Sequence, residues 1–510
     1  MAAKKHETEV EGGGRFDAVL EHILIHYRWV FVLLLLPLSL VYDALLYVRT
    51  WVVFQLSSAP GKHALKVQRV ADQVKQWKAE GGRVPMCTAR PTWQTMSFRH
   101  SNYKKTFFTV NLNLVDILEL SAEKRTVRVE PLVTMGQLTA TLDPLGWTLP
   151  FVPELDDLTV GGLVMGTGVE TSSHKYGLFQ HICVAYELVL ADGSTVQVTK
   201  ESDPDLFYAV PWSYGTLGLL TAVEIQIVPA LRFVKLQYDP VHSLDEAVAA
   251  INRLLALQDN NEFVEALMFS KDEGVVMTGN MVSCADWGKL NEIGRCYKPW
   301  FFEHVRTFLK TGPAVEYIPL RDYQHRHSRS LFWEIKEIIP FGNNVLFRYL
   351  FGWMTPPKVS LLKLTQTQAV KKLYENNHII QDMLVPIETL KDAVLFFDKE
   401  VEVYPLWLCP FRLPSEPGML QVPKDSMYVD IGVYGVPGKQ GFQPKETTRR
   451  IEAFVAKAKG FQMLYADTYT TREEFRKMFN HSLYDKVRAR LKCEKAFPEV
   501  YDKVCRKARD

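Results

Sequence analysis

Four glycines lie within eight positions of the segment TVGGLVMGTGVETSSHKYG, which covers residues 159–177. Glycine loses more conformational entropy on folding than any other residue, so a cluster indicates positive φ angles or a close approach of the main chain to a bulky group. The spacing is not the G-x-G-x-x-G fingerprint, because Thr171 takes the third glycine position, and no Gly-Lys-Ser/Thr follows as in a P-loop. The segment therefore predicts either a phosphate-binding loop of another kind or a tight structural turn.

The charge and cysteine content exclude several classes of protein. The 510 residues allow two or three domains with large cores, and 60 basic against 58 acidic residues leave a net charge of only +2. No basic stripe interleaved with aromatic residues indicates nucleic-acid binding. The seven cysteines are scattered, without the spacing of a zinc site or a disulfide scaffold. We therefore predict no metal site and a body that faces a reducing compartment.

The most apolar stretch is WVFVLLLLPLSLVYDALLYVRTWVVF, residues 29–54, which is interrupted by Asp43 and Arg49. A bilayer core requires about 20 apolar residues in a helix, so the stretch predicts a spanning helix or signal anchor. A helix in the membrane surface and a buried helix of a soluble protein are the alternatives, whereas no small-residue cleavage site marks a removable signal peptide. Acidic residues precede the stretch and basic residues follow it, which predicts a cytosolic carboxy-terminal body.

The rest of the chain mixes helices and strands without a strict βαβ alternation. Residues 64–78 carry the apolar spacing of an amphipathic helix, and residues 126–133 alternate like a half-buried strand. A hairpin is predicted to turn at Asp192-Gly193. Beyond Pro229 come further strands and longer helices. We therefore predict an α+β fold with a domain boundary near Pro229.

Several motifs, read in order, identify a family. VRVEPLVTMGQLTATLDPLGWTLP, LTVGG, ELVLADGS and DPDLFYAVPWSYGTLGLLTAVEIQIVP, all within residues 110–229, resemble the flavin domain of the p-cresol methylhydroxylase (PCMH)/vanillyl-alcohol oxidase family. The resemblance implies an amino-terminal tail and membrane helix (1–56), a two-subdomain PCMH-type FAD-binding domain (57–230), and an α+β substrate domain (231–510) that covers the isoalloxazine ring.

Segments outside the flavin domain narrow the resemblance further. HYRWVFVLLLLPLSL, YKPWFFEHV, LFWEIKEIIPFGNN, YPLWLCPF and GFQMLYADTY are similar to the sterol-reducing branch of the family. That branch implies an FAD-dependent, NADPH-using reductase of the C24=C25 double bond of sterol side chains, a desmosterol-to-cholesterol type of reaction in sterol biosynthesis. It also implies the endoplasmic reticulum membrane, with the Golgi membrane as an alternative. A flavin oxidase or dehydrogenase of a hydroxy compound, and an inactive membrane scaffold, are the rival functions.

The resemblance places the cofactor on the glycine segment, where bare main-chain N–H groups can approach the FAD diphosphate. The residues it implies are Thr159, Val160, Gly161, Gly162, Leu163, Val164, Met165, Gly166, Thr167, Gly168, Val169, Glu170 and Thr171.

A second, glycine-rich diphosphate loop of the family is missing. Its place is taken by MCTARPTWQTMS, where Arg90 and the hydroxyls of Thr88, Thr92 and Ser97 could compensate. This stretch also lacks the histidine that tethers flavin in some relatives, so we expect FAD to be bound non-covalently.

Reduction of an isolated alkene requires a hydride and a proton on adjacent carbons. The acid must be protonated near pH 7, as a tyrosine is. The segment YADTYTTREEF offers Tyr465 and Tyr469, which we predict as the catalytic acids. The motif RDYQHRHSRS, residues 321–330, predicts a charged surface loop or, alternatively, a site for the 2′-phosphate of NADPH.

Overall fold

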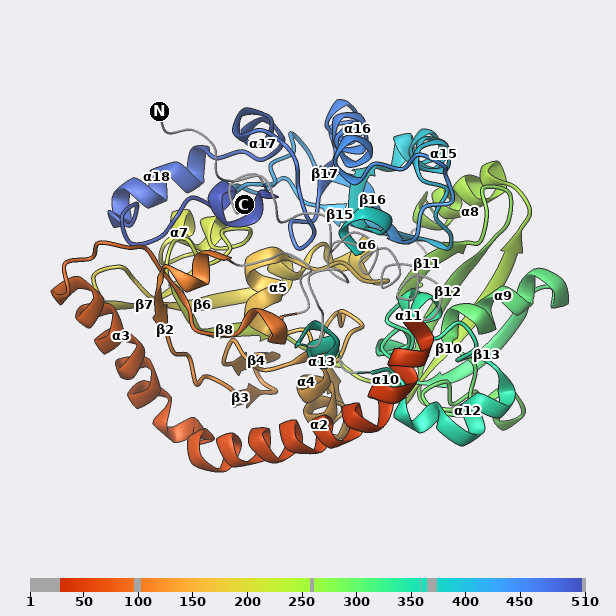
Figure 1. The fold of residues 1–510 in the computed structure, drawn as a ribbon, viewed down its shortest axis with the longest axis horizontal. Helices are drawn as coiled ribbons and strands as arrows, with labels where there is room; N and C mark the ends of the chain where they lie inside the picture. The colour runs from red at the N-terminus through yellow and green to blue at the C-terminus, as the bar shows by residue number, and fades with distance from the viewer. Residues whose placement is uncertain (1–27, 96–101, 257–260, 358, 365–373, 507–510) are drawn as a thin grey trace, which may run out of the picture.

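The computed structural model describes residues 28–95, 102–256, 261–357, 359–364 and 374–506. It has the α+β architecture expected from the sequence, with two large antiparallel sheets that lie side by side (Figure 1).

The smaller sheet has five strands in the order β3-β4-β8-β6-β7. Its strands are β3 (Ile117–Ser121), β4 (Thr126–Val129), β6 (Cys183–Val189), β7 (Thr195–Thr199) and β8 (Leu219–Gln226). The strands β6 and β7 form the expected hairpin, and Gly193 takes a positive φ of 86° in its turn.

Two short ladders flank this sheet, and the helices of the first half surround it. The ladders pair β1 (Met86–Thr88) with β2 (Phe108–Val110), and β5 (Trp147–Thr148) with β9 (Val228–Pro229). The helices are α3 (His63–Ala79), α4 (Met135–Leu142), α5 (Val160–Gly166), α6 (Ser173–Tyr176) and α7 (Pro204–Ala209). The predicted amphipathic helix at 64–78 is therefore confirmed as α3.

The larger sheet has eight strands in the order β13-β10-β12-β11-β15-β16-β14-β17. Its strands are β10 (Phe233–Val241), β11 (Phe263–Met268), β12 (Gly274–Val282), β13 (Ala314–Pro319), β14 (Ile379–Pro386), β15 (Leu406–Leu413), β16 (Ser426–Gly435) and β17 (Phe461–Gln462).

The two faces of the larger sheet have different partners. Met383 and Val433 belong to a core cluster with helices α8 (Leu244–Ala256), α15 (Leu390–Glu400) and α16 (Pro444–Lys457). Leu384 and Tyr434 belong instead to the main core, which includes the glycine segment. Because successive residues of a strand point to opposite faces, one face of this sheet is turned toward the first half of the chain.

Shorter helices complete the second half. They are α9 (Phe301–Thr311), α10 (Leu320–Gln324), α11 (Glu334–Ile338), α12 (Val345–Phe351), α13 (Val359–Leu364), α17 (Arg472–Met478), α18 (Ser482–Leu491) and α19 (Val500–Val504), together with the 3₁₀ turn η7 (Gly352–Met354). The 3₁₀ turn η2 (Thr92–Gln94) belongs to the first half and follows β1.

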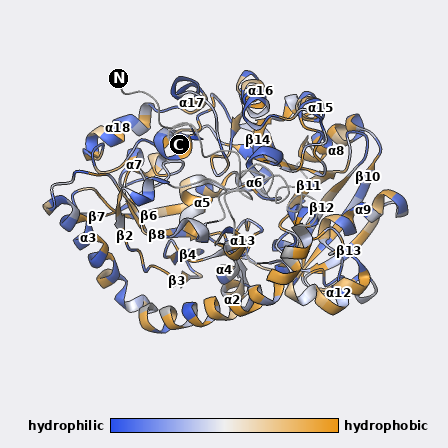
Figure 2. Cartoon of the chain, viewed as in Figure 1, coloured by the Kyte–Doolittle hydropathy of each residue, from blue (hydrophilic) through white to orange (hydrophobic). Residues whose placement is uncertain are grey.

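The apolar stretch near the amino terminus forms one long helix, α2 (Arg28–Ser57), along the outside of the molecule (Figure 1). Its part Leu33–Leu56 is, within the described residues, the one helix long and apolar enough to cross a membrane, with a mean hydropathy of 1.5. Leu36 and Ser39 are buried against the body, while most of its other large apolar side chains are exposed. Figure 2 shows this mainly hydrophobic helix at the edge of the molecule.

Buried charges tie α3 to the smaller sheet. Lys66 Nζ lies 2.7 Å from Asp116 Oδ2 and 2.6 Å from a carboxylate oxygen of Glu130. His63 bridges two carboxylates, with Nδ1 at 2.7 Å from Glu130 Oε1 and Nε2 at 2.9 Å from Glu187 Oε1. Burial would lower the pKa of His63, but the hydrogen bonds to Glu130 and Glu187 raise it to about 8.

We expect this histidine to make stability depend on pH. A folded-state pKa of about 8 against 6.5 for the free side chain stabilises the fold below about pH 6.5, and this contribution is lost as the pH rises through 8. The shift corresponds to about 2 kcal/mol. The free energy of unfolding, measured in urea for the wild type and for His63→Gln, should therefore converge by that amount between about pH 6 and pH 9. Two parallel pH profiles would contradict the assignment.

Candidate functional site

The glycine segment folds into α5 and an extended run that follows it. A Cβ on Gly161 would lie 2.7 Å from Pro131 Cβ, and one on Gly166 would lie 2.9 Å from Tyr214 Oη. A Cβ on Gly168 would lie 2.9 Å from Leu163 Cδ2. Packing of the chain on itself therefore disfavours a side chain at these three positions, most strictly at Gly161, where the Pro131 carbonyl oxygen also lies only 3.0 Å away. None of the four glycines has a positive φ, which Thr167 adopts instead, at 72°.

The fourth glycine, Gly162, is different. The N–H groups of Val160 and Gly161 donate to the carbonyls of Val133 and Pro131, whereas the Gly162 amide has no hydrogen-bond partner among the described residues. A Cβ on Gly162 would meet only the Thr159 hydroxyl, at 3.2 Å. An open amide beside a hydroxyl is what an oxygen-rich anion requires.

Two cationic side chains, those of Arg90 and Lys104, lie close to Thr159 and Gly162. Arg90 Nη1 donates to Thr159 Oγ1 at 3.1 Å, and Lys104 Nζ donates to the Arg90 carbonyl at 2.6 Å. Burial lowers the pKa of both side chains, which means that their charges lack a full aqueous shell. Within the described chain, no acidic side chain hydrogen-bonds to either cation. Thr159, Gly162, Arg90 and Lys104 thus offer the donors that a diphosphate needs.

The structure describes part of the stretch MCTARPTWQTMS, which was predicted to compensate for the missing glycine-rich loop. Arg90 does reach the glycine segment. Thr88 contributes its carbonyl as an acceptor for Lys104 at 3.1 Å. Thr92 begins η2 and its carbonyl accepts from Thr95. Ser97 lies outside the described residues.

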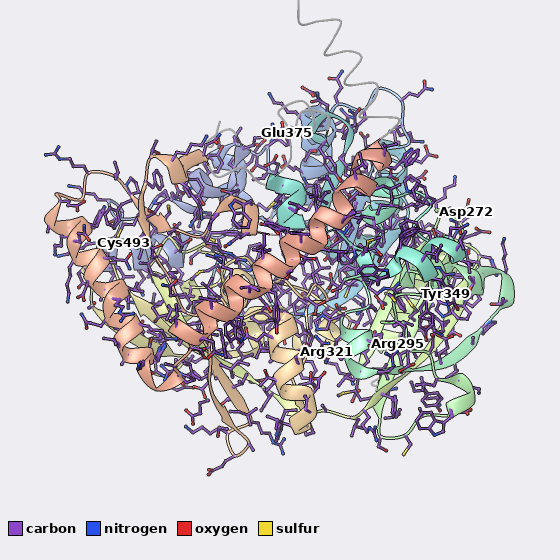
Figure 3. The ribbon with its side chains drawn as sticks, turned by 60° about the horizontal axis from the view of Figure 1, so that its bottom comes forward. Asp272, Arg295, Arg321, Tyr349, Glu375 and Cys493 are labelled. Atoms are coloured by element: carbon purple, nitrogen blue, oxygen red, sulfur yellow. The ribbon has the colours of Figure 1, made fainter. Side chains whose placement is uncertain are left out.

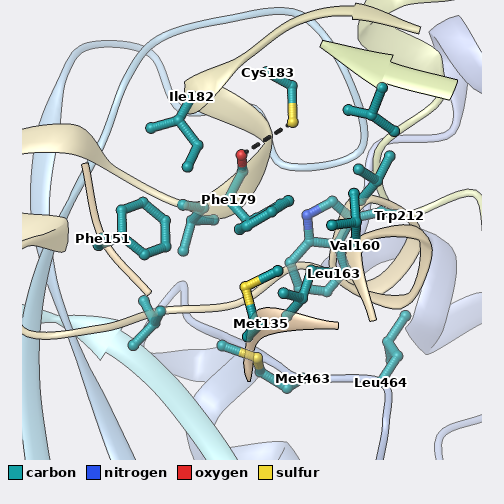
Figure 4. Close-up of a cluster of buried hydrophobic side chains, with 14 of the residues drawn as sticks. Met135, Phe151, Val160, Leu163, Phe179, Ile182, Cys183, Trp212, Met463 and Leu464 are labelled. Atoms are coloured by element: carbon teal, nitrogen blue, oxygen red, sulfur yellow. Dashed lines mark hydrogen bonds between the residues drawn. The ribbon is translucent and has the colours of Figure 1, made fainter. Parts of the chain in front are cut away.

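The buried side of α5 joins the two halves of the chain (Figure 4). Val160 and Leu163 belong to one core with Trp212 from the first half and with Met463 and Leu464 from the second. The residue after Leu464 is the predicted acid Tyr465, so this packing brings the carboxy-terminal segment to the glycine segment.

A small cavity of about 20 Å³ is lined by the second half of the glycine segment. Glu170 and Thr171 line it together with residues of both halves, among them Phe151, Phe263 and Tyr323. The Tyr323 hydroxyl donates to Thr171 Oγ1 at 3.3 Å. The cavity therefore lies between the first half of the chain and the larger sheet.

A buried arginine spans the same boundary. Arg326 Nη2 lies 2.7 Å from Glu170 Oε1 and 2.8 Å from Glu265 Oε2, and its Nε donates to Glu265 Oε1 at 2.9 Å. Burial alone would raise the pKa of Glu265, but the Arg326 guanidinium outweighs it and lowers the pKa to about 2. Burial and the neighbouring Glu170 raise the pKa of Glu154 well above its usual value.

The prediction of a surface loop at residues 321–330 is therefore wrong. Arg326 and His327 are fully buried, and Arg329 donates to three main-chain carbonyls within the protein. The arginines of the motif contact other segments of the chain inside the protein, and the sequence alone does not reveal these contacts. Its guanidiniums at 326 and 329 are already engaged, which leaves them poorly suited to bind a nucleotide phosphate.

A second polar cluster lies on the face of the larger sheet that is turned toward the first half. Asp382 of β14 pairs in register with Gly432 of β16, and Tyr434 crosses over that glycine to donate its hydroxyl to Asp382 Oδ1. A Cβ on Gly432 would lie 2.6 Å from the Tyr434 hydroxyl, so only glycine permits this path. Asp430 points to the same face, and neither of its carboxyl oxygens has a hydrogen-bond partner among the described residues.

Titration of this cluster is shifted upward. Burial raises the pKa of Asp382 to about 6, and burial together with Asp382 raises the pKa of Asp430 well above its usual value. Burial also raises the pKa of Tyr465, which is hydrogen-bonded to Asp382. These shifts favour the protonated, neutral forms of Asp382, Asp430 and Tyr465.

The other predicted acid, Tyr469, lies in a different environment. Its hydroxyl accepts from Arg506 Nη1 at 3.3 Å, and Arg506 also pairs with Asp467 at 2.9 Å and with Glu375 at 2.7 Å. Burial raises the pKa of Tyr469 to about 12. The structure thus separates the two tyrosines into a buried carboxyl cluster and a half-exposed ion-pair network.

Sequence reasoning missed most of the residues on this sheet face. Glu265, Asp382 and Asp430 each stand as a single acid inside an otherwise apolar strand (FVEALM, IIQDMLVP and SMYVDIGVYG). Isolated buried carboxyls are costly unless they are paired or protonated, so this repeated pattern was a detectable signal.

The chain is similar in sequence to several known proteins. A family profile described as an FAD binding domain matches residues 68–199. The chain is 58% identical to the Delta(24)-sterol reductase of Homo sapiens, over 96% of both chains. It is 48% identical to the Delta(24)-sterol reductase homolog dhcr-24 of Caenorhabditis elegans, over 97% of this chain and 98% of that protein. It is 40% identical to the Delta(24)-sterol reductase of Arabidopsis thaliana, over 94% and 91%.

The buried arginine yields a stability prediction. Arg326→Met leaves two carboxylates buried without their cation, so we expect the free energy of unfolding to fall by about 3 to 5 kcal/mol. Arg321→Met is the matched control, because this guanidinium is half-exposed and 3.6 Å from Asp156 Oδ1; its effect should stay below about 1 kcal/mol. Urea unfolding followed by tryptophan fluorescence measures both. Equal effects would show that the buried network contributes nothing special.

Proposed function

Because the chain belongs to the Delta(24)-sterol reductase family, we propose that it uses NADPH and non-covalent FAD to saturate the C24=C25 double bond of a sterol side chain. It is an oxidoreductase with an FAD-binding domain. We keep the domain limits 1–56, 57–230 and 231–510 as part of the proposal, and likewise a site in the endoplasmic reticulum membrane with a cytosolic body.

The observation that carries this proposal is the meeting of the glycine segment with the polar face of the larger sheet. The corner formed by Gly162, Thr159, Arg90 and Lys104 suits the diphosphate of FAD. Bound FAD, once reduced by NADPH, supplies the hydride for one carbon of the alkene. The cavity beside Glu170 and Thr171 lies at the same boundary between the two halves of the chain.

The proton is assigned to Tyr465. Its raised pKa keeps the phenol neutral at pH 7, as a general acid must be. Protonation at C24 leaves positive charge on the more substituted C25, which is the easier direction for an isolated alkene. Tyr469 is the weaker candidate, because its hydroxyl already accepts from Arg506.

The two aspartates give Tyr465 a source of protons. A tyrosine that has lost its proton must be reprotonated before the next turnover, and Asp382 is its hydrogen-bond partner. Burial and the neighbouring Asp382 raise the pKa of Asp430 on the next strand well above its usual value, which favours its protonated form. We therefore infer that Asp430 and Asp382 return a proton to Tyr465, while Tyr434 fixes the position of Asp382.

The overall proposal is tested by reconstitution with FAD, NADPH and desmosterol. We expect anaerobic NADPH to bleach the flavin and desmosterol to restore its colour, with a side chain that has gained two hydrogen atoms. Flavin that is bound but not bleached would favour the hydroxy-compound oxidase. Protein that retains no flavin would favour the inactive scaffold.

Arg90 provides a test of the cofactor corner. Removal of a charge-assisted contact to a diphosphate in Arg90→Met should weaken FAD binding by about 10- to 100-fold, from about 1.5 to 3 kcal/mol per such bond. The dissociation constant is measured by flavin fluorescence with the apoprotein. Arg83→Met is the control, since Arg83 is exposed and lies in the loop before β1. Unchanged FAD affinity in Arg90→Met would place the diphosphate elsewhere.

Single-residue variants test the proton donor. Tyr465→Phe should slow reoxidation of the reduced flavin by sterol by about 10²- to 10⁴-fold, while its reduction by NADPH keeps its rate. Stopped-flow absorbance separates the two half-reactions. Tyr469→Phe is the matched control, for which we expect nearly the wild-type rate. The reverse pattern, with Tyr469→Phe slow and Tyr465→Phe normal, would move the acid to Tyr469.

A further inference from the structure

A long segment after the buried arginine carries no acidic residue. Between Glu337 and Glu375 the sequence has no aspartate or glutamate. Its five basic residues are Arg348, Lys358, Lys363, Lys371 and Lys372. In a chain whose charges otherwise nearly cancel, this is a local excess of positive charge in the sequence, although Lys363 Nζ is already bound by the carbonyl of Thr95. Such an excess suits an anionic surface.

The same segment exposes large apolar side chains on α12 and η7. They are Val345, Leu346, Tyr349, Leu350, Phe351 and Trp353. The exposed fraction is 67% for Leu346 and 64% for Tyr349. A contiguous apolar patch of this kind on a protein surface usually marks an interaction site. The apolar helix Val345–Met354 is too short to span a bilayer.

The α12 patch, defined by these six residues, continues the exposed surface of α2. The helix α2 contacts both η7 and α11, and Trp29 packs edge-on against Phe341, with 5.5 Å between ring centroids. Figure 3 shows α2 across this face, with Tyr349 toward its right side. Leu34, Leu38 and Leu45 of α2 are exposed as well.

We propose that α12 and η7 form a second membrane-binding element, which lies in the surface of an anionic bilayer beside α2. Tyr349 and Trp353 have the amphipathic rings that favour the headgroup region. Arg348 lies on the same short helix, and its guanidinium is held by the carbonyls of Asn343 and Tyr297. The charge of the segment selects lipid over a second copy of the chain, which would bring like charges together.

The packing of α2 supports an in-plane position. A helix that spans the bilayer would have no contact with the body beyond the headgroup region. In contrast, Leu36 and Ser39, in the first half of α2, are buried against the body. Tyr42, further along, contacts the ring of Trp93 at 6.5 Å between centroids. A helix that packs along the body in this way can bury only its outer face in lipid. The α12 patch lies next to the amino-terminal part of α2.

The test uses the full-length holoprotein with one fluorescent probe at a time. The exposed Cys284 and Cys296 are replaced by serine, while the other five cysteines are buried. An NBD probe is attached at Leu346→Cys, and the control probe is attached at Glu473→Cys of the exposed α17, on the opposite side of the molecule (Figure 1). Vesicles of phosphatidylcholine and phosphatidylserine carry a doxyl quencher in the acyl chains.

We expect the probe at 346 to shift to the blue and to be quenched by doxyl lipid, as a probe at Leu45→Cys of α2 should be. The probe at 473 should remain in water. A probe at 346 that stays in water while the probe at 45 is quenched would overturn the proposal. So would a probe at 346 that is shielded without lipid, because a second copy would then cover the patch.

A variant that changes charge at the patch gives an independent measurement. Leu346→Glu with Leu350→Glu should lower partitioning onto anionic vesicles by about tenfold or more, and the loss should be smaller on neutral vesicles. Leu395→Glu, at an exposed leucine of α15, is the control. Retained flavin absorbance shows that each variant is folded. Equal partitioning of the double variant and the control would contradict the proposal.

Discussion

The buried guanidinium of Arg326 holds the two halves of the molecule in register. It contacts Glu170, at the end of the glycine segment, and Glu265, on the central strand β11 of the larger sheet. Such a cation cannot move without leaving carboxylates unpaired in a low-dielectric interior. The distance between the proposed cofactor corner and the polar sheet face is therefore fixed by electrostatics as well as by the apolar core of Val160, Leu163 and Met463.

Local patterns made much of the fold predictable. The spacing of apolar residues indicated α3, the Asp192-Gly193 turn indicated the hairpin, and the order of motifs indicated the flavin domain. Tertiary contacts were not visible in the same way. Nothing local distinguishes Arg326, buried between carboxylates, from Arg321 in the same motif, which is half-exposed.

The glycine cluster illustrates both outcomes. The high glycine content singled out this segment. The glycines were expected to expose main-chain N–H groups to a ligand, and the structure supports that explanation for Gly162 alone. At Gly161, Gly166 and Gly168, a larger residue would instead meet Pro131, Tyr214 and Leu163, respectively. In contrast, the single acids within apolar strands were visible in the sequence. Only the structure shows that Asp382 and Asp430 lie on the same face of the sheet.

The packing of α2 against the body bears on whether the enzyme can be separated from its amino-terminal apolar helix. Leu36 is almost fully buried, and the Tyr42 ring contacts Trp93 in η2, three positions after Arg90. A chain trimmed to begin at α3 would expose these apolar contacts and loosen the loop that carries Arg90 to the proposed cofactor corner. The amino-terminal helix is thus part of the folded body, and solubility gained by its removal would come with a disturbance beside the proposed FAD site.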